Sequence, residues 1–185
     1  MTLRISVFGG SQPKPGDPAY IQAYQLGKFL GSAGYTVLTG GYIGTMEAVS
    51  RGAAEAGGHV IGVTCDEIEA WRPVRPNPWL SEEMRFPTLS QRLTALIENC
   101  DAALALPGGV GTLAEISLMW NQLLTAIIPP RPLITIGIGW QAVFNQLFTS
   151  HDSYIPQAQR AWLHHSPDVT TAFRQLQEML SSGKV

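Results

Sequence analysis

Three short glycine-rich turns each come directly after an apolar segment and directly before a helical one. They occupy residues 8–11, 39–44 and 107–115. Apolar segments that alternate with helical patterns are typical of βαβ units, which build parallel sheets. Because the carboxyl ends of parallel strands meet at one edge of a sheet, we expect all three turns to face a single crevice. Open α/β sheets bind their ligands in such crevices.

The alternation of strand and helix continues along the whole chain. Expected strands lie at residues 4–8, 35–38, 59–63, 84–86, 101–106 and 132–138. Expected helices lie at residues 18–32, 45–56, 89–99, 140–149 and 168–180, and a further long helix carries Glu115 on its first turn. This alternation predicts an α/β fold with a doubly wound, mainly parallel sheet and helices on both faces.

One domain spanning residues 1–185 accounts for the whole length. Of the 185 residues, 45% are hydrophobic, which suffices for a sizeable core without a second domain. The proline-rich segment at about residues 70–80, with Trp71 and Trp79, interrupts the alternation. We expect it to be an irregular surface insertion, with a lid or a subunit contact as the alternative. The acidic side chains just before it, Asp66, Glu67 and Glu69, are expected in a solvated loop.

The charge pattern favours a small-molecule ligand over a macromolecular one. The net charge is −2, only 14% of residues are charged, and no run of Lys or Arg occurs. Neither a nucleic acid nor a membrane surface is therefore an expected partner. We expect a cytoplasmic protein, since a strand begins within a few residues of the amino terminus and no apolar stretch has the length of a membrane span.

The cysteines and histidines do not form a metal-binding pattern. Cys65 and Cys100 show no C-x-x-C pairing and are expected to be buried structural thiols. His59 and His151 are isolated, and the adjacent His164 and His165 would point to opposite sides of any regular element. We predict no metal site.

The turn at residues 107–115 has the features of a phosphate-binding loop. Gly108, Gly109 and Gly111 let backbone N–H groups approach an anion, and the following helix adds unpaired donors and the positive end of its dipole. Glu115 needs a separate explanation, because a carboxylate repels phosphate. Thr112 and Glu115 have the T-x-x-E spacing of a capping box, so a structural role and a catalytic one are equally supported by this spacing.

The sequence Pro107-Gly108-Gly109-Val110-Gly111-Thr112, with Glu115 three residues later, resembles the PGGxGTxxE signature of the LOG family, whose members are often labelled lysine decarboxylase-like. Arg92 lies fifteen residues before Pro107, at the place of an arginine in the family motif. The segment at residues 40–46 is similar to the family's second glycine-rich turn. The resemblance runs from the first strand to about Phe148.

This resemblance implies a Rossmann-like fold, a homodimer or higher homo-oligomer with sites near its interface, and no cofactor. It also implies hydrolysis of a nucleoside 5′-monophosphate, such as AMP or a cytokinin riboside monophosphate, to the free base and ribose 5-phosphate. The chain departs from the family at residues 89–93, where Leu-Ser-Gln-Arg-Leu replaces Met-His-Glu-Arg-Lys, and at Thr39 and Glu47, where the family has glycines. These departures affect the part of the site expected to surround the base.

Two other functions stay open at this stage. The chain could be a non-catalytic carrier of a nucleotide or phosphorylated cofactor, or an oligomeric scaffold whose glycine turns serve packing alone. Without the resemblance, Arg92 would be a solvated residue on the polar face of a helix whose apolar side carries Leu89, Leu93, Leu96 and Ile97. Pyridoxal-phosphate chemistry is not expected, because it needs a lysine in the site and Lys14, Lys28 and Lys184 lie in a loop, in mid-helix and at the terminus.

The resemblance and the glycine turns together define the candidate site. The candidate catalytic residues are Arg92 and Glu115. The expected ligand is a small-molecule nucleotide or sugar phosphate, and the residues expected to bind it or its phosphate are Gly9, Gly10, Ser11, Gly40, Gly41, Gly44, Met46, Gly108, Gly109, Gly111 and Thr112.

Overall fold

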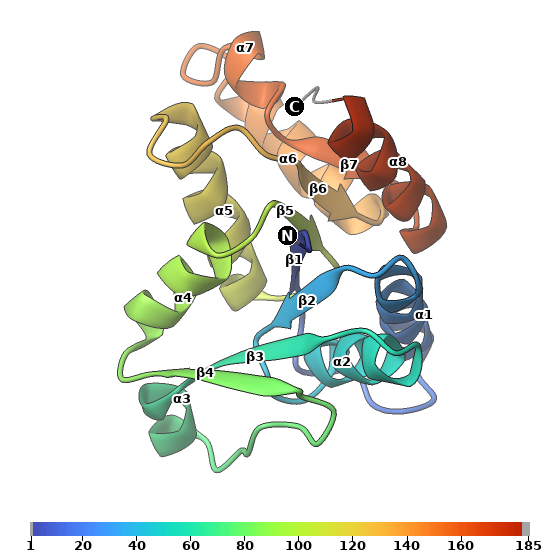
Figure 1. The fold of residues 1–185 in the computed structure, drawn as a ribbon. Coiled ribbons are helices and arrows are strands. Elements are labelled where there is room, and N and C mark those ends of the chain that lie inside the picture. Colours follow the sequence, from blue (N-terminus) through green and yellow to red (C-terminus); the bar gives the residue numbers. More distant parts are fainter. Residues whose placement is uncertain (1, 183–185) are drawn as a thin grey trace.

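The computed structural model describes residues 2–182, which form a parallel β-sheet between two layers of helices (Figure 1). Lys184 lies outside the described residues. In the described chain the sheet has seven strands, in the order β4-β3-β2-β1-β5-β6-β7. The strands are β1 (Arg4–Phe8), β2 (Thr36–Thr39), β3 (Val60–Cys65), β4 (Glu82–Phe86), β5 (Ala102–Ala105), β6 (Leu133–Ile136) and β7 (His164–Ser166).

Every described helix except the last lies between two consecutive strands, as the crossovers of a parallel sheet require. Within the described chain, none of them has both the length and the hydropathy needed to cross a bilayer. The helices are α1 (Pro18–Ser32), α2 (Thr45–Glu55), α3 (Asp66–Trp71), α4 (Leu89–Glu98), α5 (Val110–Leu124), α6 (Ile138–Ser150), α7 (Gln157–Arg160) and α8 (Val169–Ser182).

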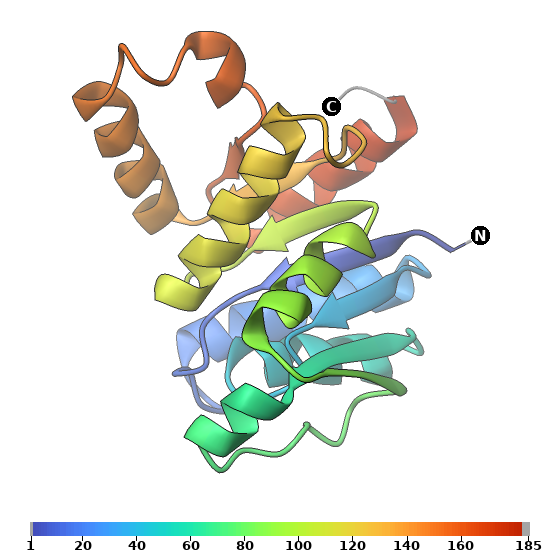
Figure 2. The same ribbon diagram turned by 90° about the vertical axis from the view of Figure 1, so that its left-hand side faces the viewer.

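Two hydrophobic cores lie on opposite faces of the sheet. On one face, α1, α2 and α8 pack against alternate strand residues such as Ile5 and Val7. On the other face, α4, α5 and α6 pack against the intervening residues such as Phe8 and Ala103. Figures 1 and 2 show these layers from two directions, with α1 and α2 on one side of the sheet and α4 and α5 on the other. The predicted doubly wound α/β fold is confirmed.

The strand order reverses between β1 and β5, and this reversal positions the site. Strand β1 pairs with β2 on one side and with β5 on the other. Phe8 is opposite Ala105, and Val7 is opposite Thr39, so the three strands end at nearly the same level. The turns that follow them therefore meet at the point where the connections leave for opposite faces, which is the usual ligand site of such sheets.

Most expected elements occur within two residues of their predicted bounds, and β1 and α1 match them fully. Three elements were missed. The acidic segment expected as a solvated loop is the short helix α3, and the helix α7 and strand β7 were not expected at all. The remainder of the proline-rich insertion, residues 72–80, is irregular as predicted.

Candidate active site

The three glycine turns are bound to one another through their backbones. The Gly10 N–H donates to the carbonyl of Pro107 (3.3 Å), which joins the turn after β1 to the turn after β5. The Gly10 carbonyl accepts from both the N–H (2.9 Å) and the hydroxyl (3.0 Å) of Thr45, the first residue of α2. The expectation that these turns meet at one edge of the sheet is confirmed.

At two of these contacts an added side chain would lie unusually close to the neighbouring turn. A Cβ on Gly10 would lie 3.3 Å from the Cα of Gly108. Gly44 has a φ of +76°, and a Cβ there would lie 2.6 Å from the Cα of Ser11. Only glycine adopts such positive φ values without steric cost. Glycine at these positions therefore lets three backbones converge at the edge of the sheet.

The amino terminus of α5 is free to receive an anion. Gly109 is its N-cap residue, and no side chain caps the helix. The backbone from Gly108 to Gly111 is exposed, and a Cβ on Gly109 or Gly111 would have nothing within 4 Å. Since the first N–H groups of a helix have no partner within the helix, they can bind a phosphate together with the positive end of the helix dipole.

The capping-box explanation of Glu115 is wrong. Because α5 begins at Val110, Thr112 is its third residue rather than its N-cap, and Glu115 lies on the second turn instead of the first. From Gly111 to Glu115 the helix rises by about 6 Å. Glu115 therefore lies about one helical turn beyond the amino terminus of α5.

Glu115 faces Arg92 across the crevice. The distance from Arg92 Nη1 to Glu115 Oε1 is 3.7 Å, and the two residues are only 5% and 7% exposed. The solvated position that the helical pattern suggested for Arg92 is therefore wrong. Arg92 lies fifteen residues before Pro107 and Glu115 eight residues after it, and the two are brought together by α4 and α5, which lie side by side on one face of the sheet (Figure 2).

Backbone carbonyls hold the Arg92 guanidinium in place. Its Nε donates to the carbonyl of Val63 (2.8 Å), and its Nη2 donates to the carbonyl of Gly40 (3.2 Å). A Cβ on Gly40 would overlap this Nη2 atom, so glycine is needed for the side chain to pass. Met46 Sδ lies 4.0 Å from Nη2, and the ring centroid of Tyr42 lies 5.9 Å from the guanidinium carbon.

Burial changes the ionisation of Glu115. Loss of solvation raises the pKa of its carboxyl to about 7, although the positive charge of Arg92 acts in the opposite direction. The carboxyl therefore changes between its charged and neutral forms near neutral pH. Proton-transferring groups in enzymes commonly have pKa values in this range.

The structure places most of the predicted residues at the crevice, with two differences. Gly41 has a φ of +78° and packs against Gly62 and Thr64 of β3. It therefore supports the conformation of the second turn from the side of β3. Met46 contacts Arg92 rather than the α5 terminus.

Sequence reasoning missed two residues that hold the second turn. The amide of Asn77, in the proline-rich insertion, donates to the carbonyls of Gly41 (3.0 Å) and Tyr42 (3.1 Å). The Tyr42 hydroxyl donates to the carbonyl of Cys65 (3.0 Å). The asparagine beside prolines was the available signal, but it suggested only a turn. Thr39, which replaces a family glycine, accepts from the Gly41 N–H (3.1 Å) and thus supports the same turn.

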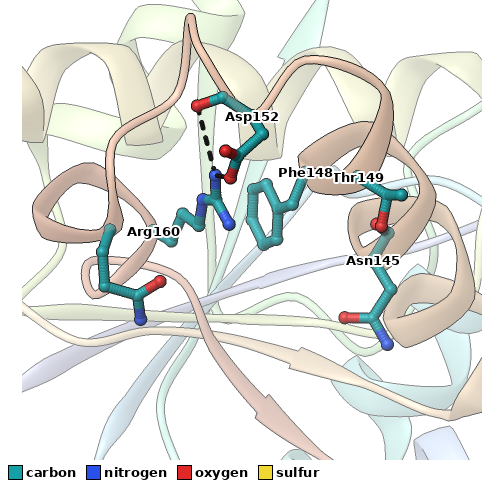
Figure 3. A pocket seen from close by; sticks show the side chains of 6 residues that line it. Asn145, Phe148, Thr149, Asp152 and Arg160 are labelled. Carbon is teal, nitrogen blue, oxygen red and sulfur yellow. Dashed lines mark hydrogen bonds and ion pairs between the residues drawn. The ribbon is translucent and has the colours of Figure 1, made fainter.

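A separate pocket lies between α6 and α7 and contains none of the predicted residues (Figure 3). Arg160 pairs there with Asp152, and its guanidinium carbon lies 5.2 Å from the ring centroid of Phe148. Because its arginine is fully engaged by Asp152 and by the Ile155 carbonyl (2.7 Å), this pocket offers no free charge to a ligand.

The model of the SLOG cluster4 family matches residues 2–128 of the chain. This range includes all three glycine turns, Arg92 and Glu115. The chain belongs to this family. A cytokinin riboside 5′-monophosphate phosphoribohydrolase of Arabidopsis thaliana is 31% identical over 95% of the chain and 81% of its own length. The resemblance to the LOG family is therefore confirmed.

Two further relatives match shorter stretches. A probable cytokinin riboside 5′-monophosphate phosphoribohydrolase of Oryza sativa is 36% identical over 65% of the chain, and the chain spans about half (49%) of its length. A pyrimidine/purine nucleotide 5′-monophosphate nucleosidase of Escherichia coli is 35% identical over 64% of the chain and 28% of its own length.

Solved structures support the fold. A molybdenum cofactor binding protein of Rippkaea orientalis is 22% identical and superposes with a TM-score of 0.75 over 97% of this chain and 98% of its own. At this identity the likeness concerns the fold alone.

The position of Arg92 predicts how Glu115 titrates. Replacing Arg92 by Met removes the charge that favours the carboxylate, so the pKa of Glu115 should rise above about 7. The measurement is a ¹³C NMR titration of the glutamate carboxyls, with the Glu115 signal assigned from its loss in a Glu115→Gln variant. An Arg174→Met variant on α8 is the control and should leave this pKa unchanged. An Arg92→Met protein in which the pKa falls or stays the same would contradict the proposed pairing.

Proposed function

We propose that this protein hydrolyses the N-glycosidic bond of a nucleoside 5′-monophosphate, releasing the free base and ribose 5-phosphate. The observation that carries this proposal is the buried Arg92–Glu115 pair, which lies one helical turn beyond an uncapped, glycine-lined helix terminus. Such a spacing suits a ligand with a phosphate at one end and a sugar ring next to it.

The phosphate is assigned to the amino terminus of α5. Gly108, Gly109, Gly111 and Thr112 present backbone N–H groups there, and the turn at Gly9–Gly10 closes one side of the same crevice through its hydrogen bond to Pro107. A monophosphate bound in this way needs no metal ion, since the helix dipole and the unpaired N–H groups favour an anion.

The sugar is assigned to Glu115 and Arg92. Cleavage of the bond between C1′ and the base nitrogen leaves the bonding electron pair on the base and builds positive charge on the ribose ring, as in glycoside hydrolysis. The Glu115 carboxylate stabilises this charge and accepts a proton from the water whose oxygen bonds to C1′. The departing nitrogen takes up a proton from solvent, which balances the reaction.

Arg92 is assigned a positioning role rather than that of an acid. A guanidinium stays protonated at all physiological pH values and cannot supply the proton for the base. Fixed by the carbonyls of Val63 and Gly40, it instead orients Glu115 and keeps part of the buried carboxyl population ionised.

The base is the part of the substrate that this chain constrains least. Ser90 and Gln91, which replace charged or basic family residues beside Arg92, are exposed. The Gln91 N–H donates to the Thr88 hydroxyl (3.3 Å) and thereby caps α4. We propose AMP or a related monophosphate as the substrate, a class supported by the names of the relatives from Arabidopsis, Oryza and Escherichia coli.

A Glu115→Gln substitution tests the reaction. The amide keeps the shape of the side chain but carries no charge, so release of ribose 5-phosphate from AMP should fall by at least about 100-fold, the lower range for loss of acid–base catalysis. AMP binding, measured by calorimetry, should persist. The control is Glu98→Gln, an exposed glutamate on α4 that should keep full activity.

The same experiment separates the enzyme from a carrier. If wild-type protein binds AMP and other monophosphates but splits none of them, the chain is a non-catalytic carrier and the proposed reaction is wrong. If the Glu115→Gln protein remains fully active, the assigned role of Glu115 is wrong.

We also propose a homodimer that covers the apolar surface beside the site. Val110 (85% exposed) and Leu113 (36%) lie on one face of α5, and Leu89 on α4 is also exposed. Ile138, the first residue of α6, is 79% exposed. It lies near the turn after β5, because a Cβ built on the preceding Gly137 would lie 3.5 Å from the Cγ of Pro107. Exposed apolar clusters of this kind commonly mark subunit interfaces.

A cytoplasmic location is also proposed. It fits the two cysteines, which are buried and form no disulfide, because disulfides are rare in the reducing cytosol.

A charge placed on this surface tests the dimer. Light scattering should give the mass of a dimer for the wild-type protein and of a monomer for Leu113→Asp, because burying an unpaired carboxylate is costly. Ile21→Asp, on the outer side of α1, is the matched control and should remain dimeric. A monomeric wild-type protein would contradict the proposal.

A further inference from the structure

Arg72 is an arginine at the crevice that has no carboxylate partner. It follows the last residue of α3 and extends to the turn after β1, where its Nη1 donates to the Ser11 hydroxyl (3.4 Å). Its Nε is buried and has no hydrogen-bond partner among the described residues. A buried N–H of a charged group without a partner is costly, so such a group calls for an explanation.

The acidic residues nearest to Arg72 in sequence are already engaged. Asp66 and Glu69 bind Arg85 at 2.7 and 2.9 Å, and a Glu67 oxygen accepts from the Leu89 N–H (2.7 Å). No carboxylate lies within 4.0 Å of Arg72 in the described chain. Its charge is therefore available to a ligand.

The position of Ser11 connects Arg72 to the phosphate-binding turn. Ser11 follows Gly10, whose N–H donates a hydrogen bond to the carbonyl of Pro107. A Cβ built on Gly10 would lie 3.3 Å from the Cα of Gly108, so the two turns are in contact. Ser11 also lies against Gly44, where an added Cβ would lie 2.6 Å from the Cα of Ser11, so the turn after β1 is in close contact with the second glycine turn as well. The Trp71 ring lies 5.6 Å from the Arg72 guanidinium carbon and restricts its orientation.

Arg92, the other arginine beside the described glycine turns, is already engaged. Arg92 is held by two backbone carbonyls and Glu115, and the glycine turns contribute only neutral N–H groups. A phosphate monoester carries close to two negative charges at neutral pH. An arginine fork beside the helix terminus would balance part of this charge and bind two phosphate oxygens at once.

We propose that Arg72, together with Ser11, binds the phosphate of the monophosphate ligand and makes the protein select monophosphates over the corresponding nucleosides. This inference rests on the proposed function for the identity of the ligand, but it concerns binding rather than bond cleavage. It also gives the proline-rich insertion a second role beside that of Asn77, since the irregular part of the insertion begins with Arg72.

The test measures AMP and adenosine binding by calorimetry in the Glu115→Gln background, where bound AMP is not consumed. Adding Arg72→Ala should weaken AMP binding by about tenfold or more, the loss expected for a hydrogen bond to a charged group, and leave adenosine binding unchanged. Arg72→Lys, which keeps the charge without the fork, should lie between the two. Arg75→Ala, an exposed arginine three residues later in the same insertion, is the matched control and should bind AMP normally.

The outcomes separate this inference from the proposed reaction. Unchanged AMP affinity in Arg72→Ala, or equal weakening of AMP and adenosine, would overturn the role of Arg72 even if the wild-type protein splits AMP. An AMP-specific loss of affinity would support it even if the wild-type protein splits nothing. If neither the wild-type nor the Glu115→Gln protein binds any monophosphate, the inference is overturned as well.

Discussion

The turn after β1 and the turn after β5 are in direct backbone contact, and the geometry of the crevice depends on this contact. A Cβ on Gly10 would lie 3.3 Å from the Cα of Gly108, and a Cβ on Gly108 would lie 3.0 Å from the nitrogen of Gly10, so a side chain at either position would press on the other turn. The approach is possible because β1 and β5 pair in register and end at the same level. It brings the free terminus of α5 next to the turn that carries Ser11, and thus sets where an anion can bind.

The second constraint is the burial of two opposite charges beside this terminus. Removing Arg92 and Glu115 from water costs energy that their 3.7 Å separation recovers only in part, which is why the pKa of Glu115 rises despite the neighbouring arginine. The carbonyls of Val63 and Gly40 satisfy the guanidinium instead of a second carboxylate. Burial makes the ionised form of Glu115 costly, and positive charge that develops next to it stabilises this carboxylate. This property fits a role beside the ribose ring.

The sequence predicted the alternation of elements well where the signals were local. Pro18 and Gly34 mark the limits of α1, and the apolar β1 is short and uninterrupted. The elements that were missed lack such signals: α3 is mostly acidic with no apolar period, and β7 contains two histidines and a serine.

Tertiary contacts decided the parts of the site that were predicted wrongly. The prediction of a capping box failed because Gly109, three residues before Thr112, is the N-cap of α5. The burial of Arg92 could not follow from its place on α4, since it depends on the carbonyls of Val63 in β3 and of Gly40 in the turn after β2. The signature of the LOG family nevertheless identified the pair, and the structure adds the charge state of Glu115 and the free charge of Arg72.

The central claim is that the ionised Glu115 carboxylate supports cleavage at the ribose, and the pH dependence of kcat/KM tests it most directly. If the carboxylate is the active form and its pKa is about 7, kcat/KM for AMP should fall as the pH is lowered through this value and reach a plateau above it. The phosphate of AMP titrates at about pH 6, and its contribution is obtained separately from the pH dependence of AMP binding to the Glu115→Gln protein. A profile that is flat across neutral pH after this correction, or that rises as the pH falls, would contradict the account.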